Sequence, residues 1–310
     1  EGRNKAGFIP ISSVLRTAYE SLEERAKNNG EVTGIATGYI GLDRMTSGLH
    51  ADELIILAAR PSVGKTAFVL NIAKNVAVNL NETVAIFSLE MGAESLVERI
   101  ICSHASINAG HLKTGKLTPE EYTQYFVATG ALSEAPIFID DTPGIRVAEI
   151  RAKCRRLKQE RNNLGLVVID YLQLIEGNGK ESRQQEVSEI SRNLKKLAKE
   201  LKVPVIALSQ LSRGVEQRQD KRPIMSDIRE SGSIEQDADI VAFLYRDDYY
   251  RQEPDENGHV PEVEPNSTIE VIIEKNRSGP RGTVELNFMK EFNKFTNLVP
   301  DGVEQNAPMA

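Results

Sequence analysis

The segment from Ala59 to Thr66 carries residue types that can hold a phosphate group. It reads Ala-Arg-Pro-Ser-Val-Gly-Lys-Thr and matches the phosphate-binding loop pattern G-x-x-x-x-G-K-[ST], except that alanine stands at the first glycine position. In such loops, backbone N–H groups at a helix N-terminus surround phosphate oxygens. Lys65 is placed to reach the β- and γ-phosphates, and the Thr66 hydroxyl suits Mg²⁺. The residues predicted to bind a nucleoside triphosphate are Ser62, Gly64, Lys65, Thr66 and Ala67.

Two carboxylates follow apolar segments and could complete this chemistry. Asp170 ends the segment Leu166–Asp170, and ligands of open α/β sheets bind at the carboxyl ends of the strands. We predict that Asp170 holds a water on Mg²⁺. Glu90 follows the segment Val84–Ser88 and is our candidate for orienting the attacking water in line with the γ-phosphorus. Each has a plain alternative: a strand that merely ends in aspartate, and a solvated loop glutamate.

The elements that must position these residues alternate between strands and helices. Segments rich in Val, Ile and Leu predict strands at 54–58, 83–88, 136–140, 166–170, 203–209, 240–245 and 269–275. Apolar positions at helical spacing predict helices at 66–79, 147–157 and 187–201, and Thr118-Pro119-Glu120-Glu121 marks a further helix start. Unbroken apolar strands are buried on both faces. The pattern therefore predicts an α/β fold with a mainly parallel twisted sheet flanked by helices.

Composition excludes several classes of protein. The chain has 310 residues, of which 40% are hydrophobic, so it can bury a sizeable core. Its longest apolar runs are far shorter than the roughly 20 residues that span a bilayer, and we expect neither a membrane segment nor a secretory signal. Two cysteines and four histidines without metal-ligand spacing predict a reducing cytosol and no disulfide framework. The net charge of −7 excludes a uniformly basic nucleic-acid coat.

Several motifs occur together in a characteristic order. They are Thr37-Gly38-x-x-Gly41-Leu42-Asp43, Ser47-Gly48-Leu49, Arg60–Thr66, Ser88-Leu89-Glu90-Met91, Asp170-Tyr171-Leu172-Gln173-Leu174, Ser209-Gln210-Leu211-Ser212-Arg213 and Lys275-Asn276-Arg277. Over residues 10–299 this series resembles the DnaB family of bacterial replicative DNA helicases. The resemblance implies a RecA-like P-loop NTPase that uses ATP and Mg²⁺. It also implies a homo-hexameric ring with ATP sites between subunits.

The resemblance assigns further residues to this site. Gln210 is expected to sense the γ-phosphate. Arg277 is expected to act as an arginine finger on the ATP of the neighbouring subunit, with Lys275 beside it, because a guanidinium spreads charge over the transferring phosphoryl oxygens. Arg99 is expected to approach the nucleotide. From the residues alone, the better reading of Lys275 and Arg277 is an exposed pair at a strand end with no role, and only the resemblance reverses it.

The resemblance also implies contacts with single-stranded DNA. The loop Asp227–Gly232 matches a family loop that faces the channel of the ring, and the DNA-binding residues expected there are Arg229, Glu230 and Gly232. Backbone contacts of this kind read no base sequence, as a translocating motor requires. Two basic stretches, 146–161 and 192–202, are interpreted instead as solvated faces of packed helices.

The expected domain organisation has three parts. Residues 1–30 contain an amphipathic linker helix, Ile11–Lys27, that docks on a neighbouring subunit; residues 31–300 form the motor domain; residues 301–310 form a flexible tail. The family's N-terminal domain, which binds primase, has no counterpart in these residues. Primase and a helicase loader are therefore partners expected of a full-length protein of the primosome, in the cytoplasm at the replication fork.

Two other functions share part of the pattern. A RecA-like recombinase or clock-type ATPase would use Lys65, Thr66, Glu90 and Asp170 on another substrate. A nucleotide-gated assembly module would bind without hydrolysis, but it would not need a carboxylate such as Glu90 to orient water. The leading hypothesis is an ATP-dependent replicative DNA helicase motor that unwinds duplex DNA.

Overall fold

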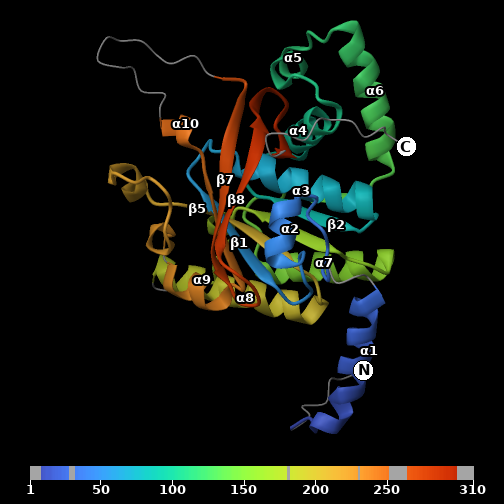
Figure 1. Cartoon of the computed structure of the whole chain (residues 1–310), viewed down its shortest axis with the longest axis vertical. Helices are drawn as coiled ribbons and strands as arrows, with labels where there is room; N and C mark the ends of the chain where they lie inside the picture. The colour runs from blue at the N-terminus through green and yellow to red at the C-terminus, as the bar shows by residue number, and fades with distance from the viewer. Residues whose placement is uncertain (1–7, 28–31, 180–181, 230, 251–263, 299–310) are drawn as a thin grey trace.

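A mixed sheet of nine strands forms the centre of the molecule, in the order β3-β2-β4-β5-β1-β6-β7-β8-β9 (Figure 1). This computed structural model describes residues 8–27, 32–179, 182–229, 231–250 and 264–298. The strands are β1 (Leu54–Ala59), β2 (Val84–Ser88), β3 (Ile137–Asp140), β4 (Leu166–Asp170), β5 (Val205–Gln210), β6 (Ile240–Tyr245), β7 (Asn266–Asn276), β8 (Gly282–Met289) and β9 (Lys294–Asn297). The first six strands in this order, from β3 to β6, pair in parallel and include β1 and β2. The last three, β7, β8 and β9, extend the sheet as an antiparallel meander.

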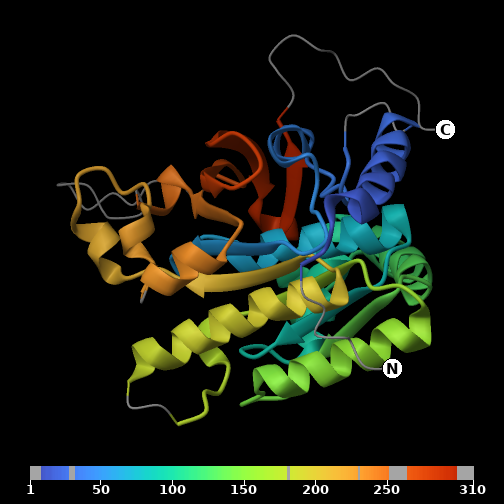
Figure 2. The same cartoon turned by 90° about the horizontal axis from the view of Figure 1, so that it is seen from below.

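Helices cover both faces of the sheet (Figure 2). They are α1 (Ile11–Lys27), α2 (Ile40–Thr46), α3 (Lys65–Leu80), α4 (Ala93–Ala105), α5 (Ala109–Thr114), α6 (Pro119–Ser133), α7 (Val147–Arg161), α8 (Arg183–Leu201), α9 (Ser231–Asp237) and α10 (Asp247–Tyr250). Successive residues of a strand point to opposite faces, and β1 divides accordingly. Ile55 and Leu57 join the core formed with α3, whereas Leu54 and Ile56 join the core formed with α7 and α8. None of the described helices is long and apolar enough to cross a membrane.

The predicted α/β architecture is confirmed, and the two main differences are the start of β5 and two additional strands; β7 also begins three residues before the predicted 269. The strand predicted from Val203 begins at Val205, because the Val203 N–H donates to the Ala198 carbonyl at the end of α8 and Pro204 has no N–H to donate. The second difference is the antiparallel meander, since neither β8 nor β9 was predicted. Every strand from β1 to β6 is where the apolar segments indicated.

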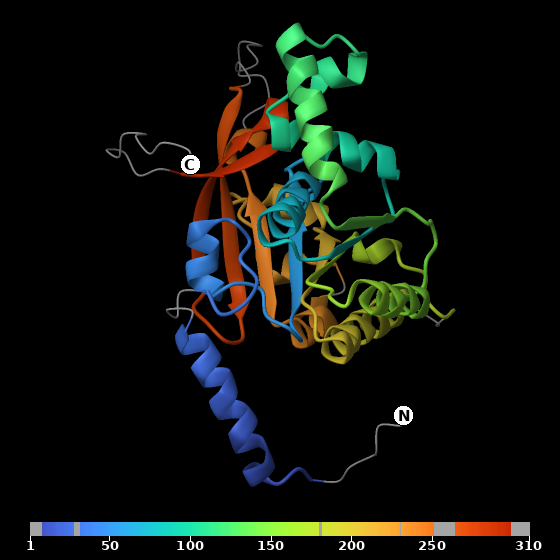
Figure 3. The same ribbon diagram turned by 90° about the vertical axis from the view of Figure 1, so that its right-hand side faces the viewer.

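The first helix stands away from the sheet and its covering helices (Figure 3). None of its residues is buried. Its apolar positions include Leu15, 58% exposed, and Tyr19, 60% exposed. An apolar stripe of this length gains nothing from solvent and is the kind of surface that packs against another element. The flexible tail predicted at 301–310 lies outside the described residues.

Candidate nucleotide site

The loop between β1 and α3 has the backbone shape that a phosphate group requires. Ser62 and Gly64 both have positive φ, of 66° and 119°. At Gly64, the N-cap of α3, a Cβ atom would also lie 3.2 Å from the Phe288 ring, so glycine is required for conformation and for space. The alanine that departs from the loop pattern, Ala59, is the buried last residue of β1 and pairs with Gln210. Because it is extended, its side chain is accommodated without the strain that positive φ brings.

Lys65 is the first residue of α3, and its side chain points into the sheet edge. The residue is 8% exposed, and its Nζ lies 3.4 Å from the Ser209 carbonyl and 5.0 Å from the centre of the Tyr171 ring. Burial lowers the pKa of this ammonium, while the carboxylates of Asp170 and Glu90 oppose the shift. A bound polyanion would stabilise the charged form of this buried group further.

Asp170 ends β4 directly beside the loop. The Thr66 hydroxyl donates to its Oδ2 at 2.9 Å, whereas its buried Oδ1 has no hydrogen-bond partner among the described residues. Burial raises the pKa of this carboxyl group against the hydrogen bond from Thr66 and the charge of Lys65. An unpartnered buried carboxylate oxygen next to a hydroxyl is a donor set that fits Mg²⁺ or its water ligands.

A cleft of about 550 Å³ joins these residues to others from distant parts of the chain. It is lined by the predicted residues Ser62, Gly64, Lys65, Thr66, Ala67, Glu90, Arg99 and Gln210, together with Arg60, Pro61, Met91, Phe288 and Asn293. Glu90 is exposed at the end of β2, where a water could reach it. Gln210 ends β5, and its N–H donates to Gln173 Oε1 at 3.4 Å. The volume and position suit a nucleotide bound at the carboxyl edge of the sheet.

Five cleft residues were not predicted as site residues, namely Arg60, Pro61, Met91, Phe288 and Asn293. Pro61 and Met91 lie within the motifs, next to predicted site residues. Arg60 pairs with Glu216 at 2.7 Å and so joins the loop to the segment after β5. Phe288 and Asn293 belong to the β8–β9 meander. Only Phe288 had a signal in the sequence, because apolar and polar residues alternate along β8 with the period of a half-buried strand.

Lys275 and Arg277 lie at the opposite edge of the same sheet. β7 runs antiparallel to β6, so its last residue pairs with Ile240 at the start of β6, next to Ile55 at the start of β1. The phosphate loop follows the other end of β1, about 20 Å away for a strand of six residues. Within one chain, therefore, Arg277 does not join Lys65 in the cleft.

The predicted DNA-binding loop lies beyond the end of β5. Leu211 forms an isolated antiparallel bridge with Ile228, and Arg229 follows it with an exposed side chain. Gly232 is exposed in the first turn of α9, whereas Glu230 lies outside the described residues. Before this loop, Arg218 makes a bidentate contact with Asp227 at 2.6 and 2.7 Å. Burial would raise the pKa of Asp227, but the hydrogen bonds from Arg218 and the Ile224 N–H keep it lower than usual.

Comparison with known proteins places this architecture in a family. A family model described as the DnaB-like helicase C terminal domain matches residues 34–297. The chain is 63% identical over 298 residues to the replicative DNA helicase DnaC of Bacillus subtilis and, equally, to the replicative DNA helicase DnaB of Geobacillus stearothermophilus. Each match covers 96% of this chain, which spans 63% of the length of those relatives.

Solved structures agree with these sequence matches. A solved ATPase domain superposes with a TM-score of 0.86 at 45% identity, covering 94% of this chain and 100% of that one. A DnaB-like replicative helicase, solved in a study of its interactions with primase, gives a TM-score of 0.83 at 45% identity, covering 96% and 69% of the two chains. This chain has a RecA-like fold and belongs to the DnaB-like helicase C-terminal domain family.

Proposed function

We propose that this chain is the ATP-hydrolysing motor of a replicative DNA helicase that moves along single-stranded DNA and unwinds duplex. The observation that carries the proposal is the meeting of Lys65, Thr66, Glu90 and Gln210 in one cleft, with Asp170 hydrogen-bonded to Thr66 beside it, in a chain of the DnaB-like family. Hydrolysis needs a phosphate clamp, a metal site and a group that orients water. This cleft contains a candidate for each.

Each cleft residue has a defined task in this proposal. Lys65 contacts the β- and γ-phosphates. Thr66 would bind Mg²⁺ through its hydroxyl, and the unpartnered oxygen of Asp170 would bind a water ligand of the ion. Bound Mg²⁺ neutralises charge on the phosphate oxygens. Glu90 orients and deprotonates the attacking water, and Gln210 contacts the γ-phosphate. Ser62, Gly64 and Ala67 offer backbone N–H groups, and Arg99 faces the nucleotide from α4.

The finger residues act between subunits in this proposal. Arg277 and Lys275 lie at the sheet edge remote from the cleft of their own chain, so a neighbouring copy is the one that can receive them. A repeated head-to-tail contact of this kind generates a closed ring when the rotation closes. We assign this chain to a homo-hexamer, and α1 is the element that docks on the neighbouring subunit with its exposed apolar stripe.

Single-stranded DNA is the proposed track of the motor. Arg229 pairs with a phosphate, and backbone groups near Glu230 and Gly232 donate hydrogen bonds. The path from the nucleotide to the DNA-binding loop is short. Gln210 is followed by Leu211, and Leu211 forms a bridge with Ile228, the residue before Arg229. Primase and a loader are proposed partners of the full-length protein in the cytoplasm, in line with the helicase that was solved in a study of primase interactions.

The test combines assembly, hydrolysis and unwinding. We expect Mg-ATP and single-stranded DNA to yield rings by electron microscopy, a DNA-stimulated ATPase, and unwinding of a forked duplex. Lys65→Ala removes the phosphate contact and abolishes hydrolysis, whereas Lys199→Ala on the exposed face of α8 leaves it unchanged. Open filaments, or rings whose ATPase ignores single-stranded DNA, contradict the motor and favour a RecA-like or clock-type ATPase.

A further inference from the structure

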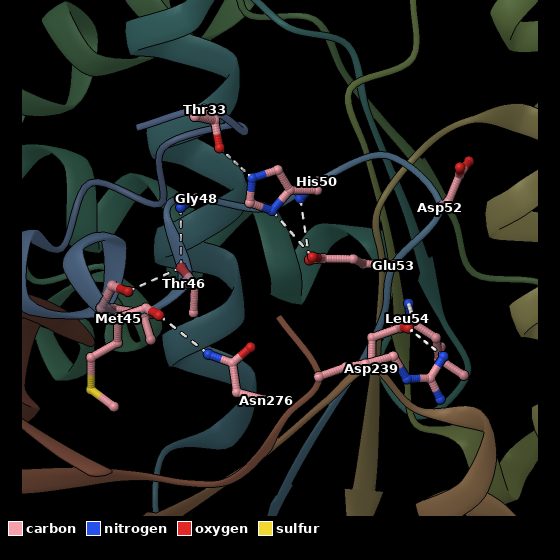
Figure 4. Close-up of polar contacts among 12 residues, drawn as sticks. Thr33, Met45, Thr46, Gly48, His50, Asp52, Glu53, Leu54, Asp239 and Asn276 are labelled. Carbon is pink, nitrogen blue, oxygen red and sulfur yellow. Dashed lines mark hydrogen bonds and ion pairs between the residues drawn. The ribbon is translucent and has the colours of Figure 1, made fainter. Parts of the chain in front are cut away.

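At the sheet edge remote from the nucleotide cleft, Asp239 is held by groups from three other parts of the chain. It lies just before β6, and its side chain is 9% exposed. Its Oδ2 accepts the Leu54 N–H at 2.8 Å and the Lys195 ammonium at 2.6 Å. Figure 4 shows Asp239 beside Leu54 at the start of β1, with Asn276 close by at the end of β7. The orientation of this carboxylate is therefore set by the sheet and by α8.

The remaining oxygen of Asp239 forms an ion pair with the proposed finger. Arg277 Nη1 lies 3.0 Å from Asp239 Oδ1, and Arg277 Nη2 donates to the Gln236 carbonyl at 3.1 Å. The Arg277 backbone N–H also donates to the Asp239 carbonyl at 2.9 Å. These contacts thus fix both ends of a long and otherwise flexible side chain. Even so, the Arg277 side chain is 50% exposed, so part of the guanidinium still faces outward.

The contacts with Asp239 and the Gln236 carbonyl hold the Arg277 guanidinium in one orientation. An arginine on a surface loses conformational entropy when its long side chain is ordered. A finger that is ordered beforehand does not lose this free energy when it meets the nucleotide. We infer that Asp239 positions Arg277 for hydrolysis in the neighbouring subunit. The inference rests on the proposed function, because it requires Arg277 to act on a neighbour's ATP.

An internal ion pair that serves only stability is the alternative. Asp239 and Lys195 are both mostly buried, and removing one partner of such a pair is destabilising whatever Arg277 does. The two roles differ in what they predict for a double variant. A positioning residue has little effect once the residue it positions is gone, whereas a purely structural residue has the same effect with or without Arg277.

The experiment is a double-mutant cycle on the full chain, with ATPase rates measured in the presence of single-stranded DNA and single-turnover hydrolysis for the slow variants. We expect Asp239→Asn to lower kcat about tenfold while KM for ATP stays within about twofold. In the Arg277→Ala background, the same change should alter the rate by less than about twofold. Asp237→Asn is the matched control: it makes the same chemical change two residues away, where the carboxylate accepts from Ser191 Oγ at 2.5 Å, and it should leave kcat unchanged.

A second variant covers the case in which Asp239→Asn does not fold. Asp239→Glu keeps the negative charge but moves the carboxylate by one methylene group, so it should preserve the melting temperature better and still lower kcat. Equal losses from Asp239→Asn with and without Arg277, or wild-type kcat in Asp239→Glu, overturn the inference. If Arg277→Ala itself hydrolyses ATP at the wild-type rate, the proposed finger is wrong and Asp239 has no finger to position.

Discussion

Glu90 differs from Lys65 and Asp170, the other charged groups beside the phosphate loop, in being exposed. Lys65 and Asp170 are buried and fixed by the strands and the loop around them, whereas Glu90 follows the end of β2, is exposed and lines the cleft. The buried groups suit binding of the phosphates and the metal, whereas an exposed carboxylate can contact a water molecule and accept its proton. This division of roles allows binding to be separated experimentally from hydrolysis.

Replacing Glu90 should therefore affect the chemical step alone. We expect Glu90→Gln to lower kcat by roughly 10²–10⁴, the usual range for a general base, while the affinity for Mg-ATP changes little. Single-turnover hydrolysis and the binding of a fluorescent ATP analogue measure the two quantities. Glu94→Gln, on the exposed first turn of α4, is the matched control. A Glu90→Gln variant with wild-type kcat removes Glu90 from the mechanism.

Asp170 gives the site a pH dependence with a defined sign. Burial raises its pKa above the ordinary value of 3.8, so protonation begins at a higher pH than for a solvated aspartate. Protonation discharges a proposed Mg²⁺ ligand, and the metal should therefore bind more weakly as the pH falls. In the metal-free protein the folded state binds this proton more tightly than the unfolded state, so the Asp170 contribution to stability rises as the pH falls.

The measurement is the increase in melting temperature that Mg²⁺ with a non-hydrolysable ATP analogue produces, recorded at intervals from pH 8 to pH 4. We expect the increase to become smaller as the pH falls toward 4, and to be small at every pH in Asp170→Asn. An increase that stays the same down to pH 4 shows that the pKa of Asp170 is not raised as argued.

At the scale of elements, α3 carries a cation that is costly to bury. Lys74 lies on the face of α3 toward α4 and β9, and burial together with the charge of Lys294 lowers its pKa to about 8. The same surroundings lower the pKa of His104, first through burial and then through these two lysines. Lys294 donates to Ser106 Oγ at 3.0 Å, which fixes its ammonium near the others.

Removing the Lys74 charge should stabilise the domain at neutral pH. Between pH 8 and 10.5 the folded state binds fewer protons than the unfolded state, so the stability of the wild type rises with pH in that window. We expect Lys74→Met to raise the free energy of unfolding by about 1 kcal/mol at pH 7, a Tm increase of roughly 2 °C, and the gain to shrink by pH 10. Thermal unfolding checks this, with the exposed Lys199→Met as control. A lower Tm at pH 7 contradicts it.

The elements also show where prediction from sequence succeeds and where it stops. The strands β1, β2, β4, β5 and β6 were predicted because they are buried on both faces and therefore read as unbroken apolar runs. β8 and β9 lie toward the end of the sheet, where one face is partly open, so their apolar residues are interrupted by polar ones. Phe288 and Asn293 were missed with them.

The site was predicted as far as local motifs reach. The loop 59–66 and its helix are contiguous in sequence, and Asp170 and Glu90 each follow an evident strand. Residues that the sheet order brings to the site from distant parts of the chain are harder to predict. For example, β5 pairs with β1 although the two strands are far apart in sequence, and no local motif shows this. The role of Gln210 was predicted only through family resemblance. Arg60 lies inside the predicted loop, but its ion pair to Glu216 was not predicted.

At the scale of the whole molecule, the proposed mechanism requires each chain to contribute to two different sites, with its cleft in one and its Arg277 in the other. The cleft opens at the carboxyl edge of the parallel strands, and Arg277 stands at their amino edge. No rearrangement of a single rigid sheet brings the two together. The proposed ring resolves this, because each copy contributes its cleft to one interface and its arginine to the other.

Mixing two inactive variants should consequently restore activity. Lys65→Ala retains the finger and lacks the phosphate contact, whereas Arg277→Ala retains the cleft and lacks the finger. At a 1:1 ratio about a quarter of the interfaces combine an intact cleft with an intact finger, so we expect hydrolysis well above the sum of the separate variants. The double variant Lys65→Ala/Arg277→Ala mixed with Arg277→Ala is the control, and it should remain inactive. Mixed rings as inactive as this control contradict catalysis between subunits.

Because the cleft and Arg277 lie at opposite edges of the sheet, opening the proposed ring has a consequence for hydrolysis. In a broken circle, the copy at one end presents a cleft with no neighbour to complete it, and the copy at the other end presents an unused arginine. Opening one interface to admit a DNA strand would therefore stop hydrolysis at that interface. Closing the interface around the strand would restore hydrolysis there, without any separate inhibitor.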